Sequence, residues 1–305
     1  MERLRIATRG SALALAQSGA VAERLRAARP GLEVTLVPLR TSGDEGVHPA
    51  PDALGDKSDF VKEIEEALLD GRAELAVHSA KDVPGSIAEG LAIVGVPERA
   101  DPRDALCGSG SLAALPPGAS VGTSSLRRRA QLLAVRPDLE VRELRGNVDT
   151  RLRRLAEGAH HAVVLAAAGL ERLGLAAGHA PLPLAEMTPA PGQGCLALEA
   201  RADDADTAAL ASTLTDPDAL ACLTAERALV SGLEATCRTP IGGYASLREG
   251  ALTLEAFAGL PSGEEWVRDA LGGDATDPAA LGRAVAERLL SAGAREILDQ
   301  AELAA

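Results

Sequence analysis

The strongest constraint on the fold is a pattern that occurs twice along the chain: an apolar strand, a small polar turn and a helix that carries arginine. The first copy spans 4–28 and the second spans 120–135. Strands that alternate with helices imply a parallel sheet covered on both faces, so the sequence predicts two similar α/β lobes. Periodicity predicts strands over 4–8, 32–39, 75–78, 139–144 and 162–166, and helices over 12–28, 60–70, 126–135 and 148–156.

Two proline-rich passages, 96–102 and 188–194, bracket the second copy of this pattern. A chain that leaves the first lobe at one passage and returns at the other would form a double hinge over a cleft. We therefore predict an α/β fold with two similar lobes around a cleft. The expected boundaries place lobe 1 at 1–98 and 192–214, and lobe 2 at 99–191.

Beyond residue 214 the pattern changes, and we predict a small C-terminal α+β domain over 215–305 with a three-stranded antiparallel sheet. Asp216 is a good N-cap, and Pro217 occupies the first helical position after it. Asp277 and Pro278 repeat this start signal for a final helix. The expected helices run from 217 to about 230 and from 278 to a cap at Gly293, and strands are expected around 251–258 and 265–270.

Charge and composition exclude several classes of partner. The formal net charge is −13 and aromatic residues make up 1% of the 305 residues, which argues against nucleic acid. No segment approaches the roughly 18 apolar residues of a membrane span, and no signal peptide is evident. The cysteines show no CxxC pair and no metal-ligand spacing. We therefore expect a cytoplasmic protein with reduced thiols and without a nucleic-acid, membrane or metal partner.

A local surplus of positive charge lies between Gly122 and Arg154, where nine arginines accompany four acidic residues. Hydroxyls, backbone N–H groups and the helix dipole converge where the helix over 126–135 begins. Because arginine binds carboxylates in a bidentate fashion, these features predict an anion site. The candidate residues at three such turns are Thr123, Ser124, Ser125, Arg127 and Arg128; Arg145, Gly146 and Arg151; and Arg9 and Ser11. For Arg136, Arg153 and Arg154 we expect a solvent-exposed helix face.

A second candidate site lies at the end of the strand over 75–78. The strand delivers Ser79, Lys81 and Asp82 to its carboxyl end, where open α/β sheets bind their ligands. The sequence alone supports Asp82 about equally as a simple turn residue and as a functional acid. In the second role, an acid beside Lys81 would stabilise a cationic intermediate or manage protons.

Cys237 differs from the other three cysteines. Cys107 and Cys195 lie in apolar, strand-like runs and Cys222 lies on an apolar helix face, so we expect all three to be buried. Cys237 lies in a polar loop of small residues beside Arg238, which would favour the thiolate. A lone cysteine in a loop is a weak signal by itself.

Seven stretches, in the same order along the chain, resemble the hydroxymethylbilane synthase (porphobilinogen deaminase) family. They are 5–11, 78–84, 121–128, 144–152, 192–194, 224–227 and the loop around Cys237. The resemblance implies lobes like those of type 2 periplasmic binding proteins, and a monomer. It also implies one dipyrromethane cofactor, built from substrate and linked to Cys237 by a thioether. In the implied reaction, four porphobilinogen molecules condense head to tail with loss of ammonia, and water releases hydroxymethylbilane.

The resemblance also implies roles for matching residues. Asp82 would act on pyrrole nitrogens and stabilise the azafulvene cation formed by deamination. Lys57 and Phe60 are candidate contacts in a loop where Asp56 and Asp59 depart from the family's glycine- and lysine-rich pattern. The residues implied to hold the cofactor and substrate, mainly through acetate and propionate side chains, are Arg9, Ser11, Ser79, Lys81, Thr123, Ser124, Ser125, Arg127, Arg128, Arg145, Gly146, Arg151, Arg172 and Gln193.

Two rival functions fit parts of the sequence. One is an anion-binding protein of the same bilobed fold that has no catalysis and no covalent cofactor. The other is an extracytoplasmic solute receptor, which the missing signal peptide and lipid-anchor cysteine disfavour. The presence of both Asp82 and Cys237 favours the enzyme over either rival.

Overall fold

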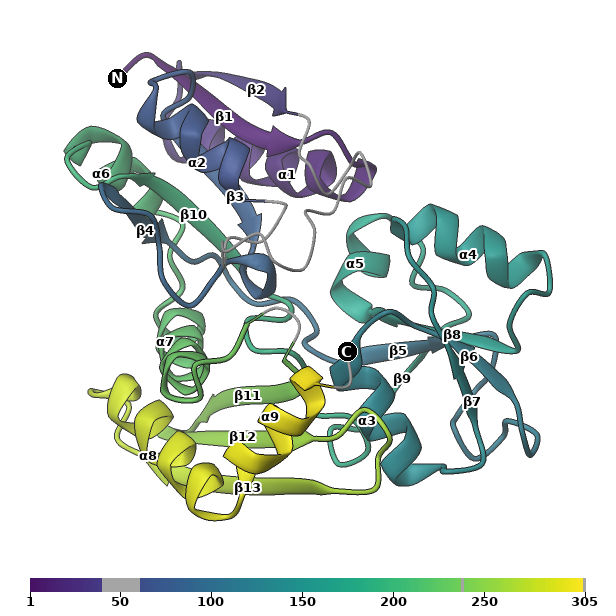
Figure 1. Cartoon of the computed structure of the whole chain (residues 1–305). Coiled ribbons are helices and arrows are strands. Elements are labelled where there is room, and N and C mark those ends of the chain that lie inside the picture. The colour runs from purple at the N-terminus through teal and green to yellow at the C-terminus, as the bar shows by residue number, and fades with distance from the viewer. Residues whose placement is uncertain (40–60, 237–238, 304–305) are drawn as a thin grey trace. The chain divides into compact units, whose positions relative to one another are not determined.

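The computed structural model describes residues 1–39, 61–236 and 239–303. The chain divides into two compact units, one formed by 1–99 with 195–220 and the other by 100–194 with 221–305. Figure 1 shows the elements of each unit. The chain passes between the units at 99–100, at 194–195 and at 220–221. The first two junctions lie in or at the end of the proline-rich passages, where the Ala100 N–H donates to the carbonyl of Gly194 (3.2 Å).

The first unit is built on a five-stranded sheet with the order β2-β1-β3-β10-β4. Its elements are β1 (Arg3–Arg9), α1 (Ala12–Ala28), β2 (Glu33–Leu39), α2 (Lys62–Leu69), β3 (Leu75–Ser79), β4 (Leu91–Gly95), β10 (Leu196–Arg201) and α6 (Ala205–Ser212). Strand β1 is parallel to both neighbours, whereas β10 is antiparallel to β3 and β4. The expectation of a wholly parallel sheet was therefore wrong, because the chain returns into this sheet from the opposite direction.

Helices cover both faces of this sheet, as the alternating pattern predicted (Figure 1). On one face, Leu4 and Ile6 pack in a buried cluster with Leu25 of α1. On the other face, Ala7 packs in a second cluster with Ile64 and Leu68 of α2. Successive residues of a strand point to opposite faces, which is why one short strand contributes to both clusters.

The second unit contains a sheet with the equivalent order, β7-β6-β8-β5-β9. Its elements are β5 (Asp104–Cys107), β6 (Ser120–Gly122), α3 (Leu126–Val135), β7 (Glu140–Arg142), α4 (Val148–Ala156), β8 (Ala162–Ala166), α5 (Ala167–Arg172) and β9 (Ala180–Pro181). Strand β6 lies between its parallel neighbours β7 and β8, as β1 lies between β2 and β3. Strand β5 runs antiparallel to β8, as β10 does to β3. The prediction of two similar α/β lobes is confirmed.

The C-terminal part contains a three-stranded antiparallel sheet with the order β11-β12-β13, as predicted. Its elements are α7 (Pro217–Gly232), β11 (Ile241–Arg248), β12 (Ala251–Gly259), β13 (Trp266–Gly273), α8 (Pro278–Ser291) and α9 (Ala294–Leu303). Leu229 of α7, Leu254 of β12 and Val285 of α8 share one buried cluster. Gly293 follows α8 with a φ of 95°, but the chain then begins α9, so the expected final helix is not the last one.

Strand β11 was not predicted from periodicity, because Gly242 and Gly243 give it the composition of a loop. Close approach accounts for both glycines. A Cβ on Gly242 would lie 2.9 Å from the carbonyl oxygen of Thr188, and one on Gly243 would lie 2.7 Å from Leu229 Cδ2. Among residues 1–39, 61–236 and 239–303, no helix is long and apolar enough to span a bilayer.

Arg136 at the end of α3 is not the exposed residue that we expected. Its side chain is only 20% exposed, and it donates to the carbonyl of Leu112 (2.6 Å) and pairs with Asp138 (2.7 Å). The side chains of Arg153 and Arg154 are 66% and 57% exposed, as predicted. Because the Arg136 guanidinium bonds a backbone carbonyl far along the chain, it stabilises the lobe.

Arg136→Met should therefore lower the melting temperature of the protein, because the Leu112 carbonyl loses its donor. Arg153→Met is the matched control, since an exposed substitution on the surface is expected to change stability little. Thermal unfolding followed by circular dichroism measures both. Equal melting temperatures for the two variants would show that the contacts of Arg136 do not stabilise the lobe.

Candidate functional site

Lobe 1 places Lys81 and Asp82 at the carboxyl end of β3, as predicted. A single 3-10 turn, η1 (Ala80–Asp82), follows the strand directly. The Ala80 N–H donates to the carbonyl of Cys195 (3.1 Å), just before β10, and the Val83 N–H donates to the carbonyl of Ala80 (3.2 Å). Asp82 and Lys81 are both half-buried, so the turn is fixed while its side chains keep some exposure.

Arg9 and Ser11 lie at the same edge of this sheet. Strand β1 ends at Arg9 and is parallel to β3, so both strands end at one edge. Ser11 is the N-cap of α1, and its hydroxyl accepts the N–H of Ala14 (3.3 Å). The structure thus gathers the predicted residues of lobe 1 that it describes at one edge of the sheet.

Lobe 2 places the hydroxyl-rich turn between β6 and α3, again as predicted. Ser125 is the N-cap of α3 and accepts the N–H of Arg128 (3.4 Å), and Thr123 Oγ1 accepts the N–H of Ser125 (3.2 Å). The Thr123 N–H donates to the carbonyl of Arg142 (3.0 Å), which ties the turn to β7. Both hydroxyls act as acceptors from the backbone, so each can still donate its own hydrogen.

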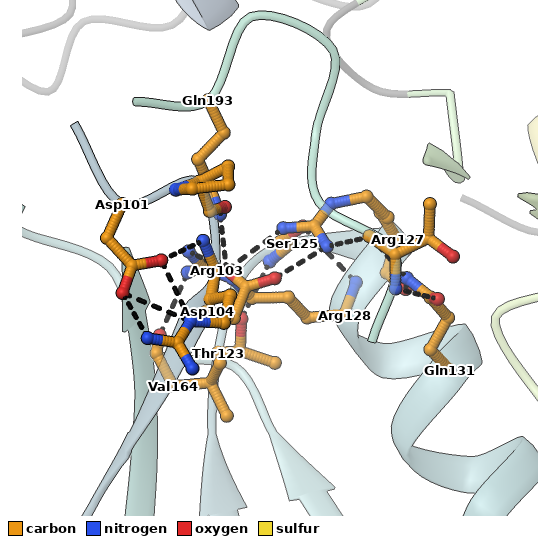
Figure 2. A network of polar contacts seen from close by, with 12 residues as sticks. Asp101, Arg103, Asp104, Thr123, Ser125, Arg127, Arg128, Gln131, Val164 and Gln193 are labelled. Carbon is orange, nitrogen blue, oxygen red and sulfur yellow. Dashed lines mark hydrogen bonds and ion pairs between the residues drawn. The ribbon is translucent and has the colours of Figure 1, made fainter. Parts of the chain in front are cut away.

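Arg127 and Arg128 are both buried, and one carboxylate binds both of them (Figure 2). Arg127 Nη1 lies 2.7 Å from Asp104 Oδ2, and Arg128 Nε lies 2.9 Å from Asp104 Oδ1. Arg127 Nη1 also donates to the carbonyl of Thr188 (2.7 Å), and Arg128 Nη1 donates to that of Val164 (2.8 Å). Burial lowers the pKa of the Arg128 guanidinium, and the charge of Asp104 opposes this effect.

Asp104 is the site residue that the sequence analysis missed. It is fully buried, and it also accepts a hydrogen bond from Gln193 Nε2 (3.1 Å). Asp104 begins β5, which is antiparallel to β8, so its amino end lies at the edge where β8 ends. An acid at the start of the apolar run Ala105-Leu106-Cys107 was the available signal, because a buried acid requires a cationic partner.

The other predicted arginines of lobe 2 lie on separate segments of the lobe. The Arg145 side chain is 64% exposed and pairs with Glu143, whereas Arg151 Nε donates to the carbonyl of Gly146 (2.7 Å). Gly146 has a φ of 109°, which explains glycine at this turn. Arg172, at the end of α5, donates to the carbonyl of Gly194 (2.7 Å).

Three cysteines are buried as predicted: Cys107, Cys195 and Cys222. Burial raises the pKa of the Cys107 thiol to about 11, although nearby Arg128 opposes the shift. Lys57, Phe60, Asp56, Asp59 and Cys237 lie outside the described residues. On either side of Cys237 and Arg238, the Thr236 N–H donates to Thr239 Oγ1 (2.8 Å), and the Thr239 N–H donates to the carbonyl of Thr236 (3.1 Å).

Comparison with known families agrees with the resemblance. Residues 4–209 match the family model "Porphobilinogen deaminase, dipyromethane cofactor binding domain", and 220–291 match "Porphobilinogen deaminase, C-terminal domain". The chain belongs to the porphobilinogen deaminase family. It is similar to the porphobilinogen deaminase of Chromobacterium violaceum, with 47% identity over 98% of this chain and 97% of the relative. It is also similar to that of Roseiflexus castenholzii, with 49% identity over 97% of this chain and 98% of the relative.

Solved structures similar to this family member include two substrate-binding proteins. One is a substrate-binding domain of a putative amino acid ABC transporter from Streptococcus pneumoniae, with 11% identity, a TM-score of 0.43, and coverage of 70% of this chain and 91% of that one. Another is the periplasmic aliphatic sulphonate binding protein of Escherichia coli, with 14% identity, a TM-score of 0.40, and coverage of 77% and 71%.

The hydrogen-bond donors of lobe 2 suit a dipyrromethane, the cofactor in the description of the family's first domain. The described turn offers hydroxyls of Thr123 and Ser125 beside the guanidinium groups of Arg127 and Arg128. Such donors suit carboxylates, which the acetate and propionate groups of a dipyrromethane provide. The guanidinium groups of Arg127 and Arg128 carry two positive charges and the Asp104 carboxylate carries one negative charge, so these three side chains have a net charge of +1. In the described part of the chain, no three His, Cys, Asp or Glu residues could together hold a metal ion.

Asp104→Asn should destabilise the protein by about 3–5 kcal/mol, because removing the carboxylate leaves two buried guanidinium groups without a counter-ion. Asp101→Asn is the matched control, since Asp101 is 25% exposed and pairs with a partly exposed Arg103. This change is expected to cost less than about 1 kcal/mol. Urea unfolding measures both values. Similar losses in the two variants would mean that Asp104 has no special role in holding the arginines.

Proposed function

We propose that this protein condenses four porphobilinogen molecules head to tail, with loss of ammonia, and releases linear hydroxymethylbilane by hydrolysis. As a porphobilinogen deaminase family member, the protein is a transferase of tetrapyrrole biosynthesis. The observation that best supports the proposal is the buried group of Asp104, Arg127 and Arg128 beside the hydroxyl turn. It provides fixed positive charge inside a chain whose formal net charge is −13.

A substrate with two carboxylates per pyrrole requires several fixed cations. Arg127 has five N–H donors, and three of them bond Asp104 and Thr188. Within the described part of the chain, the other two are left for a carboxylate. Arg128 and the Thr123 and Ser125 hydroxyls would bind the same ligand. The other residues proposed to hold cofactor or substrate are Arg9, Ser11, Ser79, Lys81, Ser124, Arg145, Gly146, Arg151, Arg172 and Gln193, with Lys57 and Phe60 in the segment that is not described.

A dipyrromethane, one per chain and linked to Cys237 by a thioether, would supply the pyrrole carbon to which the first substrate is added. This chain's own residues then bind and orient the acidic side chains. The buried positions of Cys107, Cys195 and Cys222 support Cys237 as the attachment residue, because a buried thiol is poorly accessible to a reactant.

Asp82 is proposed as the catalytic residue. Its carboxylate would accept hydrogen bonds from pyrrole N–H groups and balance the positive charge that develops on the substrate as ammonia leaves. Its position supports this role, because η1 fixes the backbone at the carboxyl end of β3 while the side chain is half-buried. A partly desolvated carboxylate stabilises a cation more strongly than one in bulk water.

The finer organisation is also proposed. Lobe 1 would comprise 1–98 and 192–214, lobe 2 would comprise 99–191, and the C-terminal domain would comprise 215–305. We propose that the protein acts as a monomer in the cytoplasm. It needs no metal or nucleic acid, since the proposed chemistry uses carboxylates, guanidinium groups and one thiol.

Intact mass spectrometry tests the covalent cofactor. The purified protein should be heavier than its sequence by the mass of a dipyrromethane, and Cys237→Ala should remove the added mass. The matched controls Cys107→Ala, Cys195→Ala and Cys222→Ala should retain it, because these thiols are buried. A fully active protein with the unmodified mass would overturn the proposal. An inactive, unmodified protein that still binds carboxylates would instead indicate the anion-binding rival.

Asp82→Asn tests the proposed catalytic residue. The amide is nearly isosteric, so the variant should fold and carry the cofactor. Turnover of porphobilinogen should fall about 10²–10⁴-fold, because the negative charge and the proton acceptor are lost. Asp203→Asn, an exposed turn residue of the same lobe, is the control and should retain full turnover. Normal turnover by a cofactor-loaded Asp82→Asn protein would show that Asp82 is a simple turn residue without a catalytic role.

A further inference from the structure

The segment 188–193, which we name the bridging segment, contacts lobe 2 through backbone and side-chain bonds. The carbonyl of Thr188 accepts from Arg127 Nη1 (2.7 Å) and from Gln131 Nε2 (3.0 Å), and the Thr188 N–H donates to Gln131 Oε1 (2.7 Å). At the other end, Gln193 Nε2 donates to Asp104 Oδ1 (3.1 Å). The side chain of Gln131 therefore bonds both the backbone N–H and the backbone carbonyl of Thr188.

The bridging segment is also hydrogen-bonded to β11 of the C-terminal sheet. The Gly243 N–H donates to the carbonyl of Pro189 (2.9 Å), and Gly242 is so close that a Cβ would meet Thr188. Glu226 is fully buried on α7 and accepts from the Gly192 N–H and from the Ala245 N–H (2.7 Å). One short segment thus bonds both the arginine cluster and the strand that follows the cysteine loop.

We propose that Gln131 is a positioning residue that, through the bridging segment, sets the distance between the Arg127 guanidinium and the start of β11. This inference rests on the proposed function, in which β11 begins at Ile241, four residues after the attachment residue Cys237. A covalent group anchored at one point and held by its carboxylates at another needs a fixed separation between the two. Gln131 is only 1% exposed, so it acts through its contacts within the protein. Besides the two bonds to Thr188, Gln131 Oε1 accepts from Arg268 Nη2 (3.3 Å) and Gln131 Nε2 donates to the carbonyl of Arg127 (3.5 Å).

Gln131→Met keeps the size of the side chain and removes both bonds to Thr188, together with the longer bonds to Arg268 and to the Arg127 carbonyl. We expect cofactor loading to slow about tenfold, which corresponds to roughly 1.4 kcal/mol in the barrier. Gly242→Ala disturbs the same contact from the β11 side, since its Cβ would lie 2.9 Å from the Thr188 carbonyl oxygen. It should slow loading in the same way. Loading is measured as the fraction with added mass over time, after apoprotein from cells that make no porphobilinogen is mixed with porphobilinogen.

Two matched controls separate positioning from general stability. Arg129 lies on the same helix α3 and donates to the carbonyl of Pro261, but it has no bond to the bridging segment, so Arg129→Met should load as the wild type does. Thr188→Val should also load normally, because Thr188 Oγ1 has no hydrogen-bond partner among the described residues. Thermal unfolding shows that each variant is folded before loading is compared.

Slow loading of folded Gln131→Met and Gly242→Ala, with both controls normal, would support the inference. Normal loading of folded Gln131→Met, or equally slow loading of Arg129→Met, would overturn it and leave the proposed function intact. Should Gln131→Met fail to fold, Gly242→Ala decides in the same way. A wild-type protein that never gains the mass would instead overturn the proposed function itself.

Discussion

The structure of lobe 2 depends on one buried carboxylate that binds two buried guanidinium groups. Burying an unpaired charge costs several kcal/mol, so neither Arg127 nor Arg128 could occupy its position without Asp104. The same carboxylate accepts from Gln193, and Arg127 extends the network to Thr188. Helix α3, strand β5 and the bridging segment 188–193 therefore each contribute a side chain to the hydrogen-bonded network around Asp104. Each of them would lose a partner if the carboxylate were removed.

Both lobes place their functional candidates at one edge of a sheet, and the antiparallel strand is part of the reason. In lobe 2 the amino end of β5 lies where β8 ends, which brings Asp104 to the edge where α3 begins. In lobe 1 the amino end of β10 lies beside Ser79, and the carbonyl of Cys195 fixes the turn that carries Asp82. In a mixed sheet, the start of an antiparallel strand lies beside the end of its neighbour. Side chains from segments far apart in the sequence can therefore meet at one edge of the sheet.

The sequence predicted local structure better than long-range partners. The bounds of α1, α3 and α4 were correct because N-caps and apolar periodicity are encoded within a few residues. The expectation of a wholly parallel sheet was wrong, since the direction of β10 depends on where the chain returns into the sheet from the other lobe. Strand β11 was missed because its two glycines are required by close contacts with Thr188 and Leu229, which lie outside the strand. Asp104 was missed and the burial of Arg136 was not expected for the same reason, because the arginines that bind Asp104 and the Leu112 carbonyl that Arg136 bonds lie more than twenty residues away in the sequence.

A cofactor that the protein builds from its own substrate imposes one more requirement, because the binding site must exist before the cofactor does. Two adjacent buried guanidinium groups would repel each other in an empty site, and water or disorder would then replace the ordered geometry. Asp104 removes this difficulty by acting as an internal counter-ion. Because it neutralises only one of the two charges, the cluster would be ordered beforehand and would still attract a carboxylate of the proposed ligand. Such preorganisation would lower the entropic cost of binding the first pyrrole.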